Sequence, residues 1–383
     1  MMFKKYKIPF NKPFVVGNEL KYIKDSVLSG HIAGDGKYSK LCESFFIKNY
    51  DLKYPLLTTS CTDALELASN LININDGDEI IIPSYTFVST ALPFSQKNLK
   101  IRFADSSKLS PNVPFSEYER LINKNTKIVV VMHYGGIACD LDPIVDLCKS
   151  KKIILIEDSA QAIHSYYKNK PLGTFGDMSC FSFHETKNII AGEGGLWVTN
   201  NKNLYDRACV LRDKGTNRKA FYQGQVDKYE WVDIGSSYLP SELISAFLYA
   251  QLEQIETIIL KRVTIWNKYY KELKVIENYG AQLPVIPNYS SNNGHIFYIL
   301  LSSKVQRLKL INFLKKRKIL ATFHYQSLHQ SLYFKKIEKN IDNLKFSDMY
   351  SDRLLRLPIY YEMSLSEVSA VIESVIDFFK LNN

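Results

Sequence analysis

The sequence is poor in cysteine, and the spacing of its cysteines predicts neither a disulfide framework nor a metal site. Its 383 residues include six cysteines, and none of them forms a CxxC pair. A chain of this length can bury a sizeable core without disulfide staples. We therefore expect six reduced thiols, several of them buried as small hydrophobic side chains, and no metal centre.

Long apolar runs are also missing. The longest runs, such as residues 128–138, are short and are interrupted by glycine, so no stretch is long enough to cross a bilayer. The first ten residues are basic but lack the apolar segment and the cleavage site of a secretion signal. These features predict a cytoplasmic protein with no membrane partner.

Acidic residues are outnumbered by basic ones, which gives a formal net charge of +10. The lysines are spread along the chain, and no nucleic-acid-binding motif accompanies them, so no nucleic-acid partner is predicted. A diffuse excess of lysine is typical of a solvated surface, and a basic field would also attract a substrate that carries a pyrophosphate. Composition does not separate these two interpretations.

Short apolar segments alternate with amphipathic stretches between about residues 54 and 200. Near-continuous runs of β-branched and other apolar residues are typical of strands that are covered on both faces. The predicted strands are residues 79–83, 101–105, 127–132, 153–157, 180–183 and 196–199, with a first strand near 56–58. Strands alternating with helices predict an α/β fold, with a mostly parallel sheet flanked by helices.

The pattern changes after residue 200. A long helical pattern covers residues 241–270, and a break rich in Pro, Asn and Ser follows at 284–293. A small α/β segment then contains strand-like runs at 296–301 and 319–323, a basic helix and a closing helix to about 381. We predict a large domain over residues 1–255, which includes the N-terminal segment, and a smaller C-terminal domain over residues 256–383.

Polar residues follow several of the predicted strands, where an open α/β sheet binds its ligands. Asp158 and Gln161 follow one strand, Lys187 follows the next, and the Ser-Cys-Thr of residues 60–62 opens a helix after the first. These residue types suit a phosphorylated pyridine aldehyde. Its phosphate needs a helix N-terminus with hydroxyl donors, which residues 60–62 offer.

The remaining groups of such a cofactor also find matching residues. Its ring nitrogen needs a carboxylate, which Asp158 can supply. Its aldehyde needs a lysine for a Schiff base, and Lys187 lies 29 residues further on, just past the next strand. The aromatic ring of Phe87 could stack on the cofactor ring.

Each feature taken alone also fits a structural role. Ser, Thr and Asp before a helix commonly cap it, an Asp at a strand end commonly closes a turn, and most lysines lie at the surface. The Gly-Glu-Gly-Gly of residues 192–195 alone indicates only a turn. The order of these residues at consecutive strand ends is what favours a cofactor site.

Longer stretches resemble a known family. Residues 158–161 (Asp-Ser-Ala-Gln), 180–188 (Cys-Phe-Ser-Phe-His-Glu-Thr-Lys-Asn) and 192–195 are similar to the sugar aminotransferases related to the DegT/DnrJ/EryC1/StrS proteins. The resemblance covers nearly the whole chain. Residues 214–218, 224–229 and 233–239 resemble one subgroup, the dTDP-4-amino-4,6-dideoxygalactose transaminases, which serve enterobacterial common antigen, lipopolysaccharide O-antigen and related surface glycans.

This resemblance implies the type I fold of PLP-dependent transferases, which is that of aspartate aminotransferase, and pyridoxal 5'-phosphate (PLP) as cofactor. It also implies a homodimer with shared active sites. Lys187 would form the Schiff base and move protons, and Asp158 would partner the pyridine nitrogen. The other implied cofactor contacts are Gln161 at the phenolic oxygen, Ser182, Cys61 and Thr62 at the phosphate, Phe87 on the ring, and Ser237 from the neighbouring subunit.

Two positions depart from the family pattern in ways that the subgroup shares. Ser237 stands where most relatives have Asn, and Cys61 stands where many have Gly. In addition, the loop between Lys187 and Gly195 is one residue shorter than in the subgroup. The implied sugar-nucleotide contacts, each of which also fits a structural or surface role, are Lys214, Arg218, Lys228, Tyr229, His324 and His329.

The implied reaction is transamination of dTDP-4-keto-6-deoxy-D-glucose by L-glutamate, which gives dTDP-4-amino-4,6-dideoxy-D-galactose and 2-oxoglutarate. Three alternatives share the fold. A 3-keto sugar nucleotide aminotransferase differs only in how the sugar sits. A PLP-dependent sugar dehydratase would replace the lysine by histidine, so Lys187 argues against it. A non-transaminating regulatory protein would bind PLP without a spectral response to glutamate.

Overall fold

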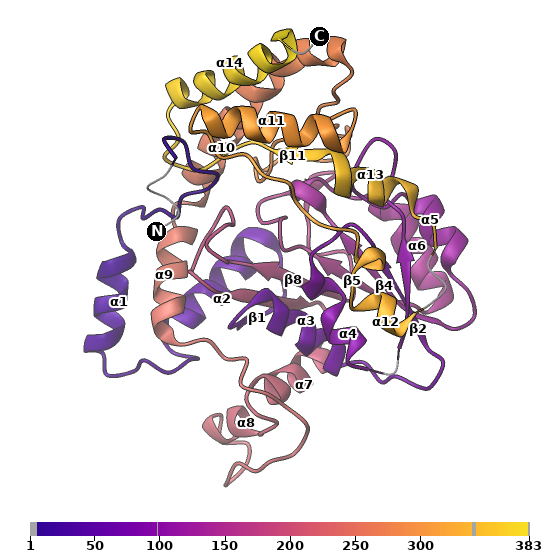
Figure 1. The fold of residues 1–383 in the computed structure, drawn as a ribbon. Coiled ribbons are helices and arrows are strands. Elements are labelled where there is room, and N and C mark those ends of the chain that lie inside the picture. The colour runs from indigo at the N-terminus through magenta and orange to yellow at the C-terminus, as the bar shows by residue number, and fades with distance from the viewer. Residues whose placement is uncertain (1–5, 98, 339–341, 382–383) are drawn as a thin grey trace.

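The computed structural model describes residues 6–97, 99–338 and 342–381, and its centre is a seven-stranded sheet (Figure 1). The strands are β1 (Tyr54–Thr58), β2 (Glu79–Pro83), β3 (Lys100–Ala104), β4 (Thr126–Met132), β5 (Ile154–Asp158), β8 (Met178–Ser182) and β9 (Gly195–Thr199). Their spatial order is β1-β9-β8-β5-β4-β2-β3. In this sheet β9 runs in the direction opposite to that of the other six strands.

The observed strands lie within two residues of the predicted ones at either end. Every residue of β2, β8 and β9 is buried, as near-continuous apolar runs predict for strands covered on both faces. The prediction of a mostly parallel α/β sheet flanked by helices is confirmed.

Alternate residues of the central strands pack on opposite helical layers. In β4, Ile128 and Val130 share a core with α3 (Cys61–Asn70) and α7 (Lys202–Arg212). Val129 and Val131 point to the other face. The helices on that second face are α5 (Phe115–Leu121), α6 (Leu141–Lys151), α2 (Lys37–Tyr50) and α9 (Glu242–Leu252).

A smaller unit of helices and a two-stranded sheet sits over one edge of this layered structure (top of Figure 1). Strands β10 (Tyr298–Leu300) and β11 (Leu354–Arg356) pair antiparallel. The main helices around them are α10 (Ile255–Glu272), α11 (Lys304–Lys316), α13 (Lys345–Arg353) and α14 (Leu365–Leu381). Ile8, from the N-terminal segment, is buried in the core of this unit.

Two local predictions about the C-terminal half are wrong. The long helix expected over residues 241–270 is two helices, α9 and α10, which meet at a 63° bend. The strand expected at 319–323 does not form, because Ile319 makes only a single bridge to Ile8 and Thr322 a single bridge to Arg356. Neither bridge is extended into a ladder.

The predicted domain boundary at residue 255 stays a prediction. Within α10, Ile258 and Ile259 pack in the core beside the large sheet, whereas Ile265 and Trp266 pack in the core of the smaller unit. As for membrane spans, none of the helices in the described part of the chain qualifies alone by length and apolar character. One bent pair, residues 242–252 with 255–279, meets those two criteria when taken together.

Candidate active site

A cavity of about 670 Å³ lies beyond the carboxyl ends of β5 and β8 and is closed on its other side by residues of the C-terminal unit. Its volume falls within the ~300–1,000 Å³ typical of cofactor and small-molecule sites. Seven of the eight predicted cofactor contacts line it, namely Lys187, Asp158, Gln161, Ser182, Cys61, Thr62 and Phe87. The residues singled out at separate strand ends therefore come together around one space.

The turn that opens α3 supplies donors for an anion. Ser60 caps the helix, because its Oγ accepts a 3.0 Å hydrogen bond from the Asp63 amide. The amides of Cys61 and Thr62 lie in the first turn, where no helical carbonyl can accept from them. Ser182, at the end of β8, adds a hydroxyl at the same cavity. The turn is capped, as the structural interpretation predicts, and it still presents the donors that a phosphate requires.

Gly195 allows β9 to pass directly beside this turn. A Cβ at that position would overlap the Ser60 carbonyl group and would lie 2.6 Å from the Cys61 amide nitrogen. A side chain there would therefore push the turn away from the cavity. Close packing between β9 and the turn therefore requires glycine at position 195. The glycine-rich loop alone does not indicate this requirement.

Asp158 is the last residue of β5, and its side chain is held in place at the cavity wall. The residue is 5% exposed. Its Oδ2 accepts a 2.6 Å hydrogen bond from the Thr90 hydroxyl, and its Oδ1 accepts one of 3.1 Å from the Ala160 amide. A carboxylate fixed in this way can partner a protonated pyridine nitrogen.

Lys187 follows β8, and its side chain lines the same cavity. Its pKa is lowered from the ordinary value, chiefly because burial disfavours the charged ammonium, and the Arg356 charge adds to the lowering. The nearby Asp158 opposes this shift. A lowered pKa increases the share of neutral amine, which is the form that attacks a carbonyl carbon.

Gln161 connects the sheet side of the cavity to the C-terminal unit. Its Oε1 accepts a 2.6 Å hydrogen bond from the Gly135 amide, and its Nε2 donates a 2.7 Å bond to the Tyr325 hydroxyl. The Tyr325 ring lies 6.1 Å from the ring of Phe87, centre to centre. Both ends of the Gln161 amide are therefore fixed, which orients this side chain at the cavity wall.

The cavity also contains residues that the sequence patterns did not single out. Among them are His295, Arg262, Tyr325 and Arg356, with Phe10 and Asn11 from the N-terminal segment. The predicted His324 lines the cavity, and its Nδ1 lies 2.7 Å from the Tyr134 hydroxyl. Burial and the neighbouring cations hold the pKa of both His295 and His324 well below the ordinary value, so both imidazoles are neutral at physiological pH.

Six predicted contacts lie outside this cavity in the described chain. Lys214, Arg218, Lys228 and Tyr229 belong to an excursion, residues 213–236, which contains α8 (Arg218–Tyr222) and extends away from the C-terminal unit (bottom of Figure 1). Ser237 is exposed at the end of this excursion. His329 is 1% exposed, and its Nδ1 lies 2.6 Å from the Ser84 hydroxyl. This buried contact fits the structural role that the sequence also allowed. The roles of these six residues stay predictions.

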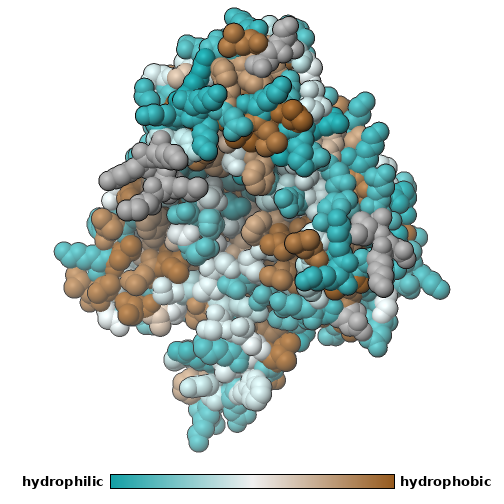
Figure 2. Space-filling model, viewed as in Figure 1, coloured by the Kyte–Doolittle hydropathy of each residue, from teal (hydrophilic) through white to brown (hydrophobic). Residues whose placement is uncertain are grey.

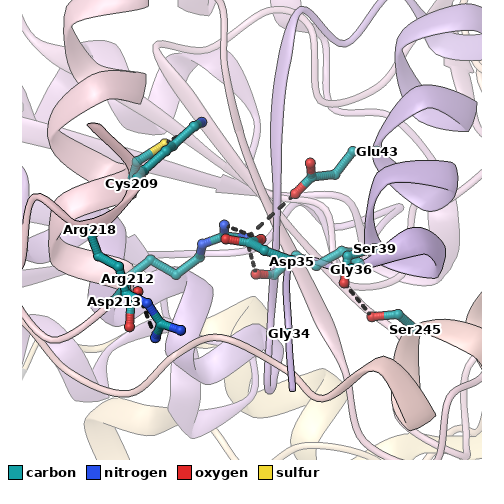
Figure 3. Close-up of polar contacts among 12 residues, drawn as sticks. Gly34, Asp35, Gly36, Ser39, Glu43, Cys209, Arg212, Asp213, Arg218 and Ser245 are labelled. Atoms are coloured by element: carbon teal, nitrogen blue, oxygen red, sulfur yellow. Dashed lines mark hydrogen bonds and ion pairs between the residues drawn. The ribbon is translucent and has the colours of Figure 1, made fainter. Parts of the chain in front are cut away.

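A polar cluster around Arg212 fixes the base of the excursion beside β1 (Figure 3). Arg212 is 3% exposed, and its Nη2 donates a 2.6 Å hydrogen bond to Asp35. Its Nη1 donates to the Leu57 carbonyl at 3.2 Å and lies 3.5 Å from a Glu43 carboxylate oxygen. Because Leu57 belongs to the strand that leads into residues 60–62, this cluster supports from behind the turn that is predicted to bind phosphate.

Glu43 makes the stability of this cluster depend on pH. Burial raises the pKa of its carboxyl group from 4.5 to about 7, although the Arg212 charge opposes the rise. Between about pH 4.5 and pH 7, the unfolded chain therefore loses a proton that the folded chain retains, and the free energy of unfolding falls as pH rises. Glu43→Gln removes this contribution. Its stability relative to the wild type should grow by up to about 3 kcal/mol between pH 4.5 and pH 8.

Urea unfolding of both proteins at the two pH values measures this difference directly. Glu117→Gln, which changes the same charge at a surface ion pair with Arg120, serves as the control and should show a much smaller change with pH. A difference between Glu43→Gln and wild type that stays constant from pH 4.5 to pH 8 would contradict the prediction.

Comparison with known proteins agrees with this geometry. The family model of the DegT/DnrJ/EryC1/StrS aminotransferases matches residues 15–376. The GDP-perosamine synthase of Vibrio cholerae is 32% identical over 380 residues, which covers 97% of this chain and 99% of that protein. Helicobacter pylori PseC, an aminotransferase involved in the biosynthesis of pseudoaminic acid, is 26% identical with a TM-score of 0.88, over 98% and 100% of the two chains.

The fold is also shared with a protein from Streptococcus pneumoniae whose structures include a PLP form. It is 21% identical, with a TM-score of 0.90 over 98% of this chain and 99% of that chain. A second structure of the same protein is its PMP (pyridoxamine phosphate) form. The family match, the type I fold and the cavity lead to one conclusion. The chain belongs to the DegT/DnrJ/EryC1/StrS aminotransferase family and is a PLP-dependent sugar aminotransferase.

Proposed function

We propose that this enzyme aminates dTDP-4-keto-6-deoxy-D-glucose with L-glutamate, which gives dTDP-4-amino-4,6-dideoxy-D-galactose and 2-oxoglutarate. The observation that carries transamination is the single cavity in which Lys187, Asp158 and the turn at residues 60–62 meet. The sugar assignment is supported by the subgroup-like stretches at 214–218 and 224–229. The relative named for GDP-perosamine makes a GDP-linked sugar the second candidate.

The residues predicted to contact the cofactor have defined tasks in this proposal. When bound, PLP supplies an electrophilic carbon and an electron sink. Residues 60–62 and Ser182 bind its phosphate, and Asp158 holds the proton on its ring nitrogen. Gln161, fixed from both sides, donates to its phenolic oxygen. The Lys187 amine would attach the cofactor covalently. Once the donor amine has displaced it, the freed amine would take the proton from the donor Cα as a general base and deliver it to the C4′ carbon of the cofactor as a general acid.

We also propose that the enzyme is a homodimer. Figure 2 shows hydrophobic side chains gathered over α1 (Glu19–Leu28), where Leu20 and Leu28 are 72% and 75% exposed. Trp231, in the excursion, is 82% exposed. A second copy that covers these surfaces could bring Ser237 to the partner's phosphate site. Light scattering should give a mass near 88 kDa, which is twice 44.1 kDa, and a mass of one chain would contradict the proposal.

An absorbance spectrum of the PLP-loaded protein tests the reaction. L-glutamate should convert the cofactor band to that of the aminated form, and dTDP-4-keto-6-deoxyglucose should restore it. NMR of the product then distinguishes a 4-amino from a 3-amino sugar. Restoration only by a GDP-linked keto sugar would move the assignment to the second candidate, and a band that glutamate leaves unchanged would require another donor. The cytoplasmic location and the glycan that receives the product stay predictions.

A further inference from the structure

His295 lines the cavity and is not one of the predicted cofactor contacts. It lies shortly before β10 and is 8% exposed. Its carbonyl accepts a 3.0 Å hydrogen bond from Arg262 Nη2, and its amide donates one of 3.0 Å to Asn293 Oδ1. The backbone of this residue is therefore held from both sides, which gives its ring a defined place in the cavity wall.

The contacts of the ring define which of its nitrogens carries the proton. His295 Nδ1 lies 2.9 Å from the side-chain oxygen of Asn188. Asn188 Nδ2 donates a 2.9 Å hydrogen bond to the Asn293 carbonyl, which can only accept, so the orientation of the Asn188 amide is fixed. Because the amide oxygen also only accepts, the proton of the neutral ring is on Nδ1. Nε2 then carries a lone pair and acts as an acceptor only.

Nε2 of His295 is free to accept a hydrogen bond from a ligand. Within the described chain it has no hydrogen-bond partner, and protein atoms do not enclose it, so it opens toward the cavity. Burial and the charges of Lys187, Arg262 and Arg356 hold the pKa of the ring well below the ordinary value. His295 therefore presents an uncharged acceptor throughout the physiological pH range.

This acceptor lies close to the amine at which the chemistry occurs. Asn188, which holds the ring, directly follows Lys187 in the chain. Of the charges that lower the His295 pKa, that of Lys187 has the largest effect. A carbon that reacts at Lys187 therefore brings its nearest substituents within reach of Nε2.

The other neutral imidazole of the cavity is less defined. His324 Nδ1 lies 2.7 Å from the Tyr134 hydroxyl, and a hydroxyl can either donate or accept. The proton of His324 can therefore sit on either nitrogen and change with the ligand. The proton of His295 is fixed by the protein before any substrate enters.

We propose that His295 Nε2 accepts a hydrogen bond from the sugar hydroxyl on C3, next to the keto carbon, and this inference rests on the function proposed above. In a 4-keto-6-deoxy sugar, C3 is the only neighbour of C4 that carries a hydroxyl, because C5 carries the ring oxygen and the methyl group. A hydroxyl can donate to Nε2, whereas the carboxylates of glutamate only accept and are repelled by its lone pair. His295 is thus a specificity-determining residue for the sugar half of the reaction.

A substrate analogue without this hydroxyl tests the assignment. With dTDP-4-keto-3,6-dideoxy-D-glucose, the second-order rate constant of the aminated wild type should be at least about tenfold lower than with dTDP-4-keto-6-deoxy-D-glucose, because a buried acceptor is left unpaired. A general disturbance of the site slows both sugars alike. The ratio of the two rate constants therefore isolates the hydrogen bond.

Two variants separate the two nitrogens of the ring. His295→Asn can place an amide nitrogen where Nδ1 stood and so keep the bond to Asn188, but it has no acceptor at the Nε2 position. Its preference for the complete sugar should fall below about threefold, and its glutamate half-reaction should change by less than about threefold. His295→Gln can place its oxygen at the Nε2 position and should keep a larger part of the preference. His164→Gln changes a histidine outside the cavity, beside Tyr50, and should resemble wild type.

Calorimetry with dTDP-6-deoxy-D-glucose adds a measurement that needs no turnover, because this ligand has a hydroxyl in place of the keto group and cannot react. Removal of its 3-hydroxyl should weaken binding to the wild type by about tenfold and binding to His295→Asn by less than about threefold.

A preference that is unchanged in His295→Asn would overturn the inference. A glutamate half-reaction that slows as much as the sugar half-reaction would overturn it as well, since the imidazole would then serve an amine, either that of Lys187 or that of the donor. If the wild type accepts only a GDP-linked 4-keto-6-deoxy sugar, the same comparison with that sugar and its 3-deoxy analogue decides the inference, although the dTDP assignment fails. A wild type that aminates neither sugar would defeat the proposed function and this inference with it.

Discussion

Replacing Lys187 by alanine should reduce the overall transamination rate by about 10⁴-fold or more, which is the largest effect that we expect from any single change. The variant loses both the amine that attaches PLP and the group that moves the proton at the donor Cα, and proton transfer alone typically contributes 10²–10⁴-fold. Lys187→Arg should be equally inactive, because a guanidinium stays protonated and cannot act as a nucleophile or a base.

Initial rates with L-glutamate and dTDP-4-keto-6-deoxyglucose measure this effect, and the absorbance of PLP-loaded samples shows whether the cofactor still attaches. Lys309→Ala removes an exposed lysine from α11 and should keep full activity. A Lys187→Ala enzyme that retained even a tenth of the wild-type rate would remove this residue from the mechanism. Loss of activity in Lys309→Ala would show that the assay reports a general effect of lysine removal.

The sheet could be predicted from sequence because its strands are defined by short-range patterns. Residues 80–82 are three consecutive isoleucines, and the matching strand β2 is buried along its whole length. The bend between α9 and α10 has no such signal, because apolar spacing continues through it. Leu252 and Ile255, on either side of the bend, pack in the same core beside the large sheet, so no change of core marks its position either. Strand-like residues at 319–323 likewise lacked a partner long enough to form a ladder.

The same difference between short-range patterns and long-range packing applies to the residues of the cavity. Asp158 and Lys187 could be singled out because parallel strands place their carboxyl ends at one edge of the sheet, so local sequence implies a shared location. Tyr325 and Arg356 belong to the C-terminal unit, and they reach the cavity only because that unit packs over the sheet. No pattern within the chain predicts that long-range contact. The role predicted for residues of the excursion, such as Lys228, would depend further on the proposed second copy of the chain.

Asp158→Asn should lower the overall rate by about 10²- to 10³-fold, the effect of removing one pre-organised electrostatic partner of a reacting group. The amide has the shape of the carboxylate but cannot balance a positive charge on the pyridine nitrogen, so the cofactor becomes a poorer electron sink. Thr90→Val tests the supporting contact. It removes the 2.6 Å hydrogen bond to Asp158 and leaves the charge, so a smaller loss of about tenfold is expected.

Reconstitution with N-methylated pyridoxal phosphate separates the charge effect from a general disturbance of the site. This analogue carries a permanent positive charge on its ring nitrogen and needs no carboxylate to keep a proton there. It should therefore restore a large part of the rate of the first half-reaction in Asp158→Asn and should give the wild type no gain. If the analogue left the variant as slow as PLP does, or if Asp158→Asn lost less than Thr90→Val, the carboxylate would not act on the ring nitrogen. Its buried bonds to Thr90 and Ala160 would then have a structural purpose only.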